Sequence, residues 1–182
     1  MWLYSIGGGA GATVLAVLAG HGFATIAFPG RNLAGAVLLG SVVVPATVLV
    51  IATSMLLSKP GLTGTPWAVV LPSSLSPFGV HLVRVHAAEA VPDELLDAAR
   101  VDGAGEARIF CQVALPLMRP AVVTVLLLSV VGTWNDYFLP LAVLSDSRLY
   151  PVTVGLGQWE SLAAMNNIGA GNRCGASWSS AR

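Results

Sequence analysis

The chain has 182 residues, of which 55% are hydrophobic and only 10% charged, and its mean hydropathy is +0.76. This composition excludes an ordinary water-soluble domain, and a formal net charge of zero gives no basic balance that would favour nucleic acid. Because about 20 apolar residues cross the hydrocarbon core, the length allows about four or five crossings and no second soluble domain.

Four segments with few or no charges predict transmembrane helices: Trp2 to Phe28, Leu33 to Leu57, Trp67 to Val83 and Ala121 to Leu144. We therefore expect an all-α fold, a polytopic transmembrane helical bundle with four spans, in the cell membrane. In the first segment the run Gly7 to Gly11 follows no strand, so it predicts close helix packing rather than a phosphate-binding loop.

Prolines interrupt two of these segments. Pro45 is expected to bend the second, and Pro72 and Pro77, with neighbouring serines, are expected to kink the third. Because lipid-facing backbone cannot stay unpaired, the third segment either begins inside a cavity or carries plain kinks.

The basic residues predict the orientation, because Lys and Arg accumulate at cytoplasmic span ends. With four crossings, Lys59 and Arg148 fall on one side, and five arginines fall on the other: Arg31, Arg84, Arg100, Arg108 and Arg119. The loop 84–119 is therefore predicted to be cytoplasmic and Met1 to lie outside. An outside start without a signal peptide suggests that an upstream span is missing from this chain.

The loop 84–119 holds ten of the eighteen formal charges, so it is either a solvated connector or a docking surface. Its residues predict a short helix, Pro92 to Val101, in which Asp93 and Glu94 suit the N-terminal end and Arg100 the C-terminal end. Gly103 supplies the stop. This internal order favours docking.

The apolar residues of this helix predict the face that meets a partner. Leu95, Ala98 and Ala99 share a stripe, with Leu96 beside them, and small residues allow close approach. A second helix, Glu106 to Leu115, follows before Pro116 and Pro120 return the chain to the membrane; it presents Ile109, Phe110 and Val113.

The run Asp97-Ala98-Ala99, then Gly103, then after nine residues Val113-Ala114-Leu115-Pro116, resembles the EAA loop of ABC importer permeases. The blocks VPDELLDAARVDGA, LPLMRPAVVT and WNDYFLPLAVL are similar to the maltose-type carbohydrate permeases in particular, over about Trp2 to Trp159. In that family the loop forms a coupling helix seated in a cleft of the ATP-hydrolysing subunit. Asp97 stands where the family usually has Glu, so the charge is kept with a shorter reach.

The resemblance implies a transmembrane permease subunit of an ATP-driven carbohydrate importer, and no enzyme. The implied ATPase-docking residues are Leu95, Asp97, Ala98, Ala99, Gly103, Leu115 and Pro116. The implied partners are ABC ATPase subunits, a second permease subunit, an extracytoplasmic sugar-binding protein, a carbohydrate substrate and membrane lipid. ATP would bind a partner subunit, because the only lysine, Lys59, lies in Ser-Lys-Pro and makes no Walker A loop.

No cofactor, metal site or catalytic residue is expected: the histidines lack ligand spacing, and Cys111 and Cys174 form no CxxC pair.

Trp134, Asn135 and Asp136 form an acidic cluster inside a predicted span, where a charge usually faces a cavity or a partner. They are candidates for the translocation pathway, and a hydrogen-bonding anchor between helices is the alternative. A membrane-embedded enzyme using Asp136 and a histidine would need a second polar catalytic group at matching depth, and the sequence offers none.

The expected organisation is a permease domain over residues 1–159 and a polar tail over 160–182. Residues 166–182 have the composition of a disordered or frame-shifted segment, and the likeness to the family ends near Gln158 to Asn167. About six spans are expected in an intact family member, so the alternative to a working permease is a truncated, non-functional fragment or a membrane scaffold. Which sugar, polyol or sugar phosphate is carried stays open at this point.

Overall fold

The computed structural model describes residues 2–26, 28–163 and 165, and these residues form helices and loops with no strand among them. Two stretches are long and apolar enough to cross a membrane: α1 (Trp2–Thr25), and residues 67–90, which comprise α4 (Trp67–Ser73) and α5 (Pro77–Ala90). Up to four crossings result if two bent helix pairs each count as one span. The predicted all-α, multi-span bundle is confirmed, and the four predicted spans are its upper bound.

The second predicted span bends sharply at its proline. α2 (Arg31–Val43) and α3 (Ala46–Ser58) meet at 104°. Pro45 has no amide hydrogen, and a residue before proline avoids helical dihedrals, so Val44 takes an extended ψ of 122°. The predicted bend is therefore confirmed, but Leu33 to Leu57 is not one straight helix.

The third predicted span is interrupted between α4 and α5. The Ser76 side chain accepts a hydrogen bond from the Gly79 amide at 3.1 Å, and Pro77 occupies the first turn of α5. These local signals start a new helix after three intervening residues, at the interruption that the serines and prolines predicted.

The fourth predicted span also divides in two, into α9 (Arg119–Asn135) and α10 (Phe138–Val143). Asp136 between them is extended, with ψ 123°, and this ends α9. A helical run bent by 78° from α9 precedes it and consists of α7 (Glu106–Ile109), the π-helix η1 (Phe110–Ala114) and α8 (Leu115–Leu117).

The remaining elements are α6 (Asp93–Val101), the 3-10 turn η2 (Ser147–Leu149) and a helical segment over 152–163. The predicted disordered segment 166–182, with Cys174, lies outside the described residues. Cys111 is exposed and forms no disulfide.

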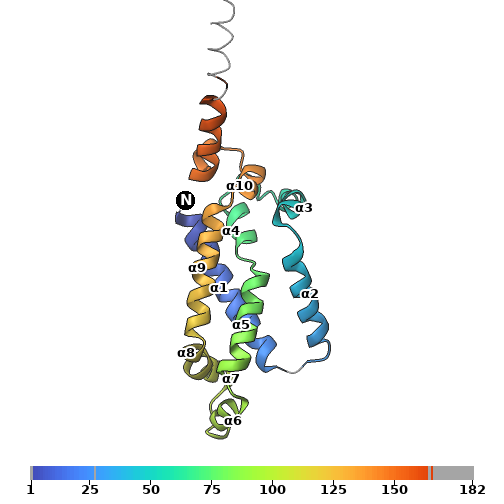
Figure 1. Cartoon of the computed structure of the whole chain (residues 1–182), viewed down its shortest axis with the longest axis vertical. Coiled ribbons are helices and arrows are strands. Elements are labelled where there is room, and N and C mark those ends of the chain that lie inside the picture. Colours follow the sequence, from blue (N-terminus) through green and yellow to red (C-terminus); the bar gives the residue numbers. More distant parts are fainter. Residues whose placement is uncertain (1, 27, 164, 166–182) are drawn as a thin grey trace, which may run out of the picture.

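The bundle is built around α1, which packs along α5 and α9 and, near its start, against α4 (Figure 1). Figure 1 shows α6 at one end of the bundle and α3 and α10 at the other, with α2 standing at the side. α3 buries none of its residues and α2 buries only Gly35, so both present apolar side chains outward, as lipid requires.

Glycines bring α1 against its neighbours, as the Gly7 to Gly11 run predicted. A Cβ on Gly8 would lie 2.8 Å from the Ser73 Cβ, and a Cβ on Gly9 would lie 2.5 Å from a Val130 methyl and 3.1 Å from its backbone. Between membrane helices such close approach supplies the van der Waals contact that holds them together, because the lipid around them is equally apolar.

We predict that Gly9→Ala destabilises the bundle by about 1–3 kcal/mol, because the new methyl meets the backbone of α9, which cannot move aside alone. Gly7→Ala is the matched control in the same helix, since its Cβ would stand 3.7 Å from the nearest atom, an ordinary contact. Thermal unfolding in detergent measures both variants. Equal midpoints for the two would contradict the packing account.

Candidate functional site

The candidate docking site is the short helix α6, which the sequence predicted from Pro92 to Val101. Pro92 precedes the helix in an extended conformation, and Asp93 and Glu94 occupy the first turn, where the helix dipole favours anions. The helix runs from Asp93 to Val101 because these end signals agree.

A Schellman turn ends α6. Gly103 has φ +80°, which favours glycine, and its amide donates to the Arg100 carbonyl at 3.0 Å. The Ala104 amide donates back to the Ala99 carbonyl at 3.1 Å, and both alanines pack against the core. Gly103 thus lies where the sharp exit was predicted.

The predicted apolar stripe of α6 is divided between two faces. Leu96, expected beside the stripe, is only 3% exposed and joins the core with Ile109, while Ala99 packs half-buried against the same core. Leu95 and Ala98 are exposed and face away from it. The side chains available to a partner are therefore on the outward face.

Val101 also belongs to this outward face, although the sequence analysis did not include it among the docking residues. It is 88% exposed, against 42% for Leu95, and it follows Ala98 at helical spacing. We name Leu95, Ala98 and Val101 the outward face of α6. The i, i+3, i+6 spacing of these three residues was visible in the sequence. Only the burial of Leu96 shows that this face, and not the one with Leu96, points to solvent.

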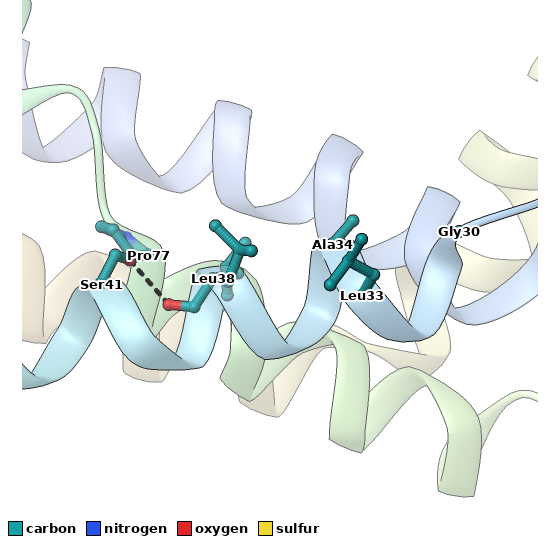
Figure 2. Close-up of a pocket in the computed structure, with 7 residues that line it drawn as sticks. Gly30, Leu33, Ala34, Leu38, Ser41 and Pro77 are labelled. Carbon is teal, nitrogen blue, oxygen red and sulfur yellow. Dashed lines mark hydrogen bonds between the residues drawn. The ribbon is translucent and has the colours of Figure 1, made fainter.

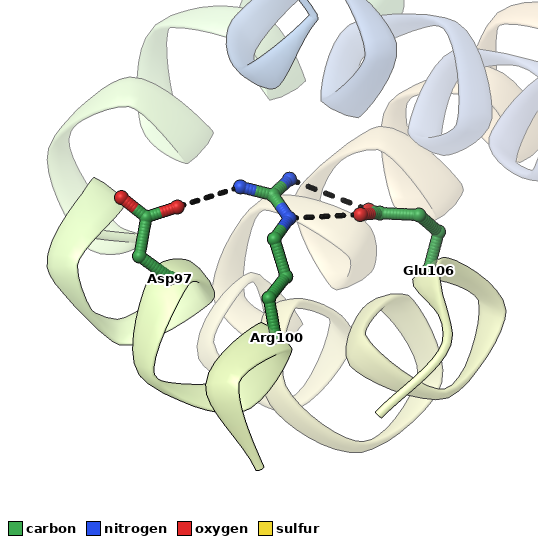
Figure 3. A network of polar contacts seen from close by, with 3 residues as sticks. All are labelled: Asp97, Arg100 and Glu106. Carbon is green, nitrogen blue, oxygen red and sulfur yellow. Dashed lines mark hydrogen bonds and ion pairs between the residues drawn. The ribbon is translucent and has the colours of Figure 1, made fainter. Parts of the chain in front are cut away.

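One arginine connects α6 to the helix that follows (Figure 3). Arg100 Nε donates to Glu106 Oε1 at 2.8 Å and Nη2 donates to Oε2 at 3.4 Å, while Nη1 donates to Asp97 Oδ1 at 2.8 Å. Pairing with Glu106, and then with Asp97, raises the pKa of the Arg100 guanidinium above its usual value. Asp97 is therefore already paired within the loop, at an exposed position where a partner can also reach it.

Leu115 and Pro116 lie apart from the outward face. Both are half-buried on α8, at the end of η1, and Leu115 packs against the core. The predicted neighbours Ile109, Phe110 and Val113 likewise face the core rather than solvent. Leu115 and Pro116, which were predicted to dock the partner, therefore lie where the loop joins the bundle.

The candidate pathway residues are separated by the end of α9. Trp134 stacks edge-on against Trp2, with ring centroids 5.5 Å apart, and Asn135 Nδ2 donates to the Val131 carbonyl of its own helix at 2.9 Å. Of the three, Asp136 alone lines a cavity of about 730 Å³ between α3, α4 and α10.

Hydroxyl groups give this cavity a polar side. They come from the interrupted third span and from α2 and α3, and they are Ser73, Ser76, Ser41, Thr47 and Thr53. A cavity was one of two alternatives at the Pro72 and Pro77 interruption, the other being plain kinks, and both prolines line this cavity. Thr47 and Thr53 lie in an apolar helix and gave no signal in the sequence.

Asp136 also makes two hydrogen bonds, while its alternative role as an anchor between helices stays a prediction. Its Oδ1 accepts a hydrogen bond from the Leu139 amide at the start of α10, at 3.4 Å, and its carbonyl accepts from Thr153 Oγ1 at 3.2 Å. Among the described residues no group of His, Cys, Asp and Glu could hold a metal ion.

Residues 12–177 match a family model described as binding-protein-dependent transport system inner membrane component. The chain is 34% identical over 139 residues to the arabinooligosaccharides transport system permease protein AraQ of Halalkalibacterium halodurans, covering 76% of this chain and 50% of that protein. It is 35% identical over 137 residues to the lactose transport system permease protein LacG of Rhizobium radiobacter, covering 75% and 50%. The chain spans about half the length of the curated relatives it matches.

Among solved structures, the fold is similar to that of a bacterial ABC transporter involved in the import of the acidic polysaccharide alginate, with a TM-score of 0.77 and 24% identity. The match covers 86% of this chain and 55% of that chain. It supports the arrangement of helices described above.

Proposed function

Because the chain belongs to the family of binding-protein-dependent transport system inner membrane components, we propose that it is the transmembrane permease subunit of an ATP-driven carbohydrate importer. The observation that carries this proposal is α6, a short helix with an exposed apolar face at the end of a membrane bundle. Relatives named for arabinooligosaccharide and lactose transport support carbohydrate as the substrate class.

In this proposal the outward face of α6 docks into a groove of a separate ATPase subunit, which supplies the energy. An amphipathic helix laid in a groove is held by its apolar side chains, and its polar flanks fix the register. Leu95 and Val101 provide the apolar contact, and Ala98 between them lets the groove approach closely. Asp97, held by Arg100, is the flanking charge.

The same proposal makes the Asp136 cavity part of the translocation pathway. A sugar needs hydroxyl and carboxylate partners beside apolar surface, and the cavity offers Ser73, Ser76 and Asp136 among apolar side chains. The other partners are a second permease subunit and an extracytoplasmic sugar-binding protein, which would deliver the substrate to the end opposite α6.

We predict that Ala98→Glu abolishes co-purification of the ATPase subunit expressed with this chain, because it places a carboxylate in the centre of the apolar face. Ala107→Glu is the matched control: it makes the same change at an exposed position of the same loop, on α7. Membrane levels of both variants are expected to equal that of the unmodified chain. Retention of the ATPase by the Ala98 variant would refute docking through this face.

We predict that the Asp136 cavity admits water. In a Cys111→Ser, Cys174→Ser background, Ser76→Cys should react with the cationic thiol reagent MTSET about tenfold faster than Val123→Cys, which lies exposed on the outer side of α9. Adding Asp136→Asn should slow the cationic reagent and leave a neutral methanethiosulfonate unchanged, because only the cation is attracted by the carboxylate. Equal rates at Ser76 and Val123 would exclude a pathway here.

A further inference from the structure

Two arginines lie close to the end of α1, Arg31 from the start of α2 and Arg84 from the middle of α5. Arg31, the first residue of α2, donates from Nη2 to the Ala24 carbonyl of α1 at 3.1 Å. Arg84 of α5 lies against Gly35, one turn further along α2, and its Cζ is 6.0 Å from the centre of the Phe23 ring. Both arginine residues are half-buried.

The two arginines hold positive charge without a counter-ion in the described part of the chain. Within the described residues, no carboxylate lies at ion-pair distance from either arginine. α1 and α2 contain no acidic residue, and Gly30 provides no side-chain cap for the positive end of α2. Like charges gathered at the edge of a low-dielectric layer are costly, so the arrangement favours an anion from outside the chain.

An apolar groove runs along α2 from Gly30, the residue before Arg31 in the chain (Figure 2). It has a volume of about 520 Å³, begins at Gly30 and ends at Ser41 and Pro77. Leu33, Ala34 and Leu38 line it between these ends. At 1.5 Å per residue, the eleven steps from Gly30 to Ser41 span about 16 Å, which is close to one leaflet of a hydrocarbon core of roughly 30 Å.

We propose that the two arginines and the groove bind one anionic phospholipid of the leaflet on the α6 side of the membrane. The phosphate lies between the guanidinium groups of Arg31 and Arg84, which can each donate two hydrogen bonds to it, and one acyl chain follows the groove along α2. Positive charge near the Gly30 end of an apolar groove, which has about the length of one leaflet, fits a lipid better than a free anion. The proposal is independent of the transport function and of any partner subunit.

The test is native mass spectrometry of the full chain in neutral detergent, titrated with dioleoyl-phosphatidylglycerol and with dioleoyl-phosphatidylcholine. We expect one phosphatidylglycerol to bind about tenfold more tightly than phosphatidylcholine. Arg31→Gln and Arg84→Gln should each lower the phosphatidylglycerol affinity several-fold, and together they should remove the preference. Ala34→Trp, which fills the groove and keeps both charges, should weaken both lipids.

Arg119→Gln is the matched control, because it removes a positive charge on the same side of the membrane, away from the groove. Equal affinity for the two lipids, or an equal loss from Arg119→Gln and Arg31→Gln, would overturn the proposal in favour of general surface charge. Displacement of phosphatidylglycerol by millimolar inorganic phosphate would overturn it in favour of a free-anion site. If Arg84→Gln loses its helical circular dichroism, the Arg31 and Ala34 variants decide the result.

Discussion

The close approach of α1 to α4, α5 and α9 is the constraint on which the rest of this molecule depends. Lipid gives helices no hydrophobic reason to associate, so their contact must come from atoms packed at short range. Gly9 lets the backbone of α9 approach, and a Cβ added at Gly20 would lie only 2.7 Å from the Val83 Cβ of α5. On α5, Gly79 faces Ala16 of α1 and Val125 of α9 and leaves the same kind of space for them. A larger residue at any of these positions would separate α1, α5 and α9 from one another.

The helix α6, which we propose docks the ATPase, belongs to this packed unit. Leu96 of α6 and Ile109 of α7 are buried in one cluster with Val83 of α5 and Val125 of α9, so the core continues from the membrane helices into the loop. Arg100 fixes α6 to α7 at the exposed side of that cluster. A force on the outward face therefore reaches the bundle through packed side chains, which suits rigid-body coupling between an ATPase and a pathway.

The sequence predicted those features that local signals decide. Pro92, Gly103 and the charges between them were enough for α6, and Pro45 was enough for the bend in the second span. The inward face of α6 could not be predicted, because positions 95 and 96 are both leucine. Only packing against α7 and α5 decides that Leu96 is buried and Leu95 is exposed. The pairing of Trp134 with Trp2 joins residues that are 132 positions apart in the sequence, so it too required the fold. Asp136 was selected because a charge inside a predicted span usually faces a cavity or a partner, and the structure places it in the lining of a cavity.

The central claim is that the outward face of α6 meets the ATPase, and the most direct measurement is the accessibility of a cysteine at Val101. In a Cys111→Ser, Cys174→Ser background, Val101→Cys is labelled with a membrane-impermeant maleimide in inside-out vesicles, with and without the ATPase subunit. The account predicts rapid labelling of the free chain, because this side chain is 88% exposed, and about tenfold protection by the ATPase. Equal labelling with and without the ATPase, or labelling only from the opposite side of the membrane, would contradict it.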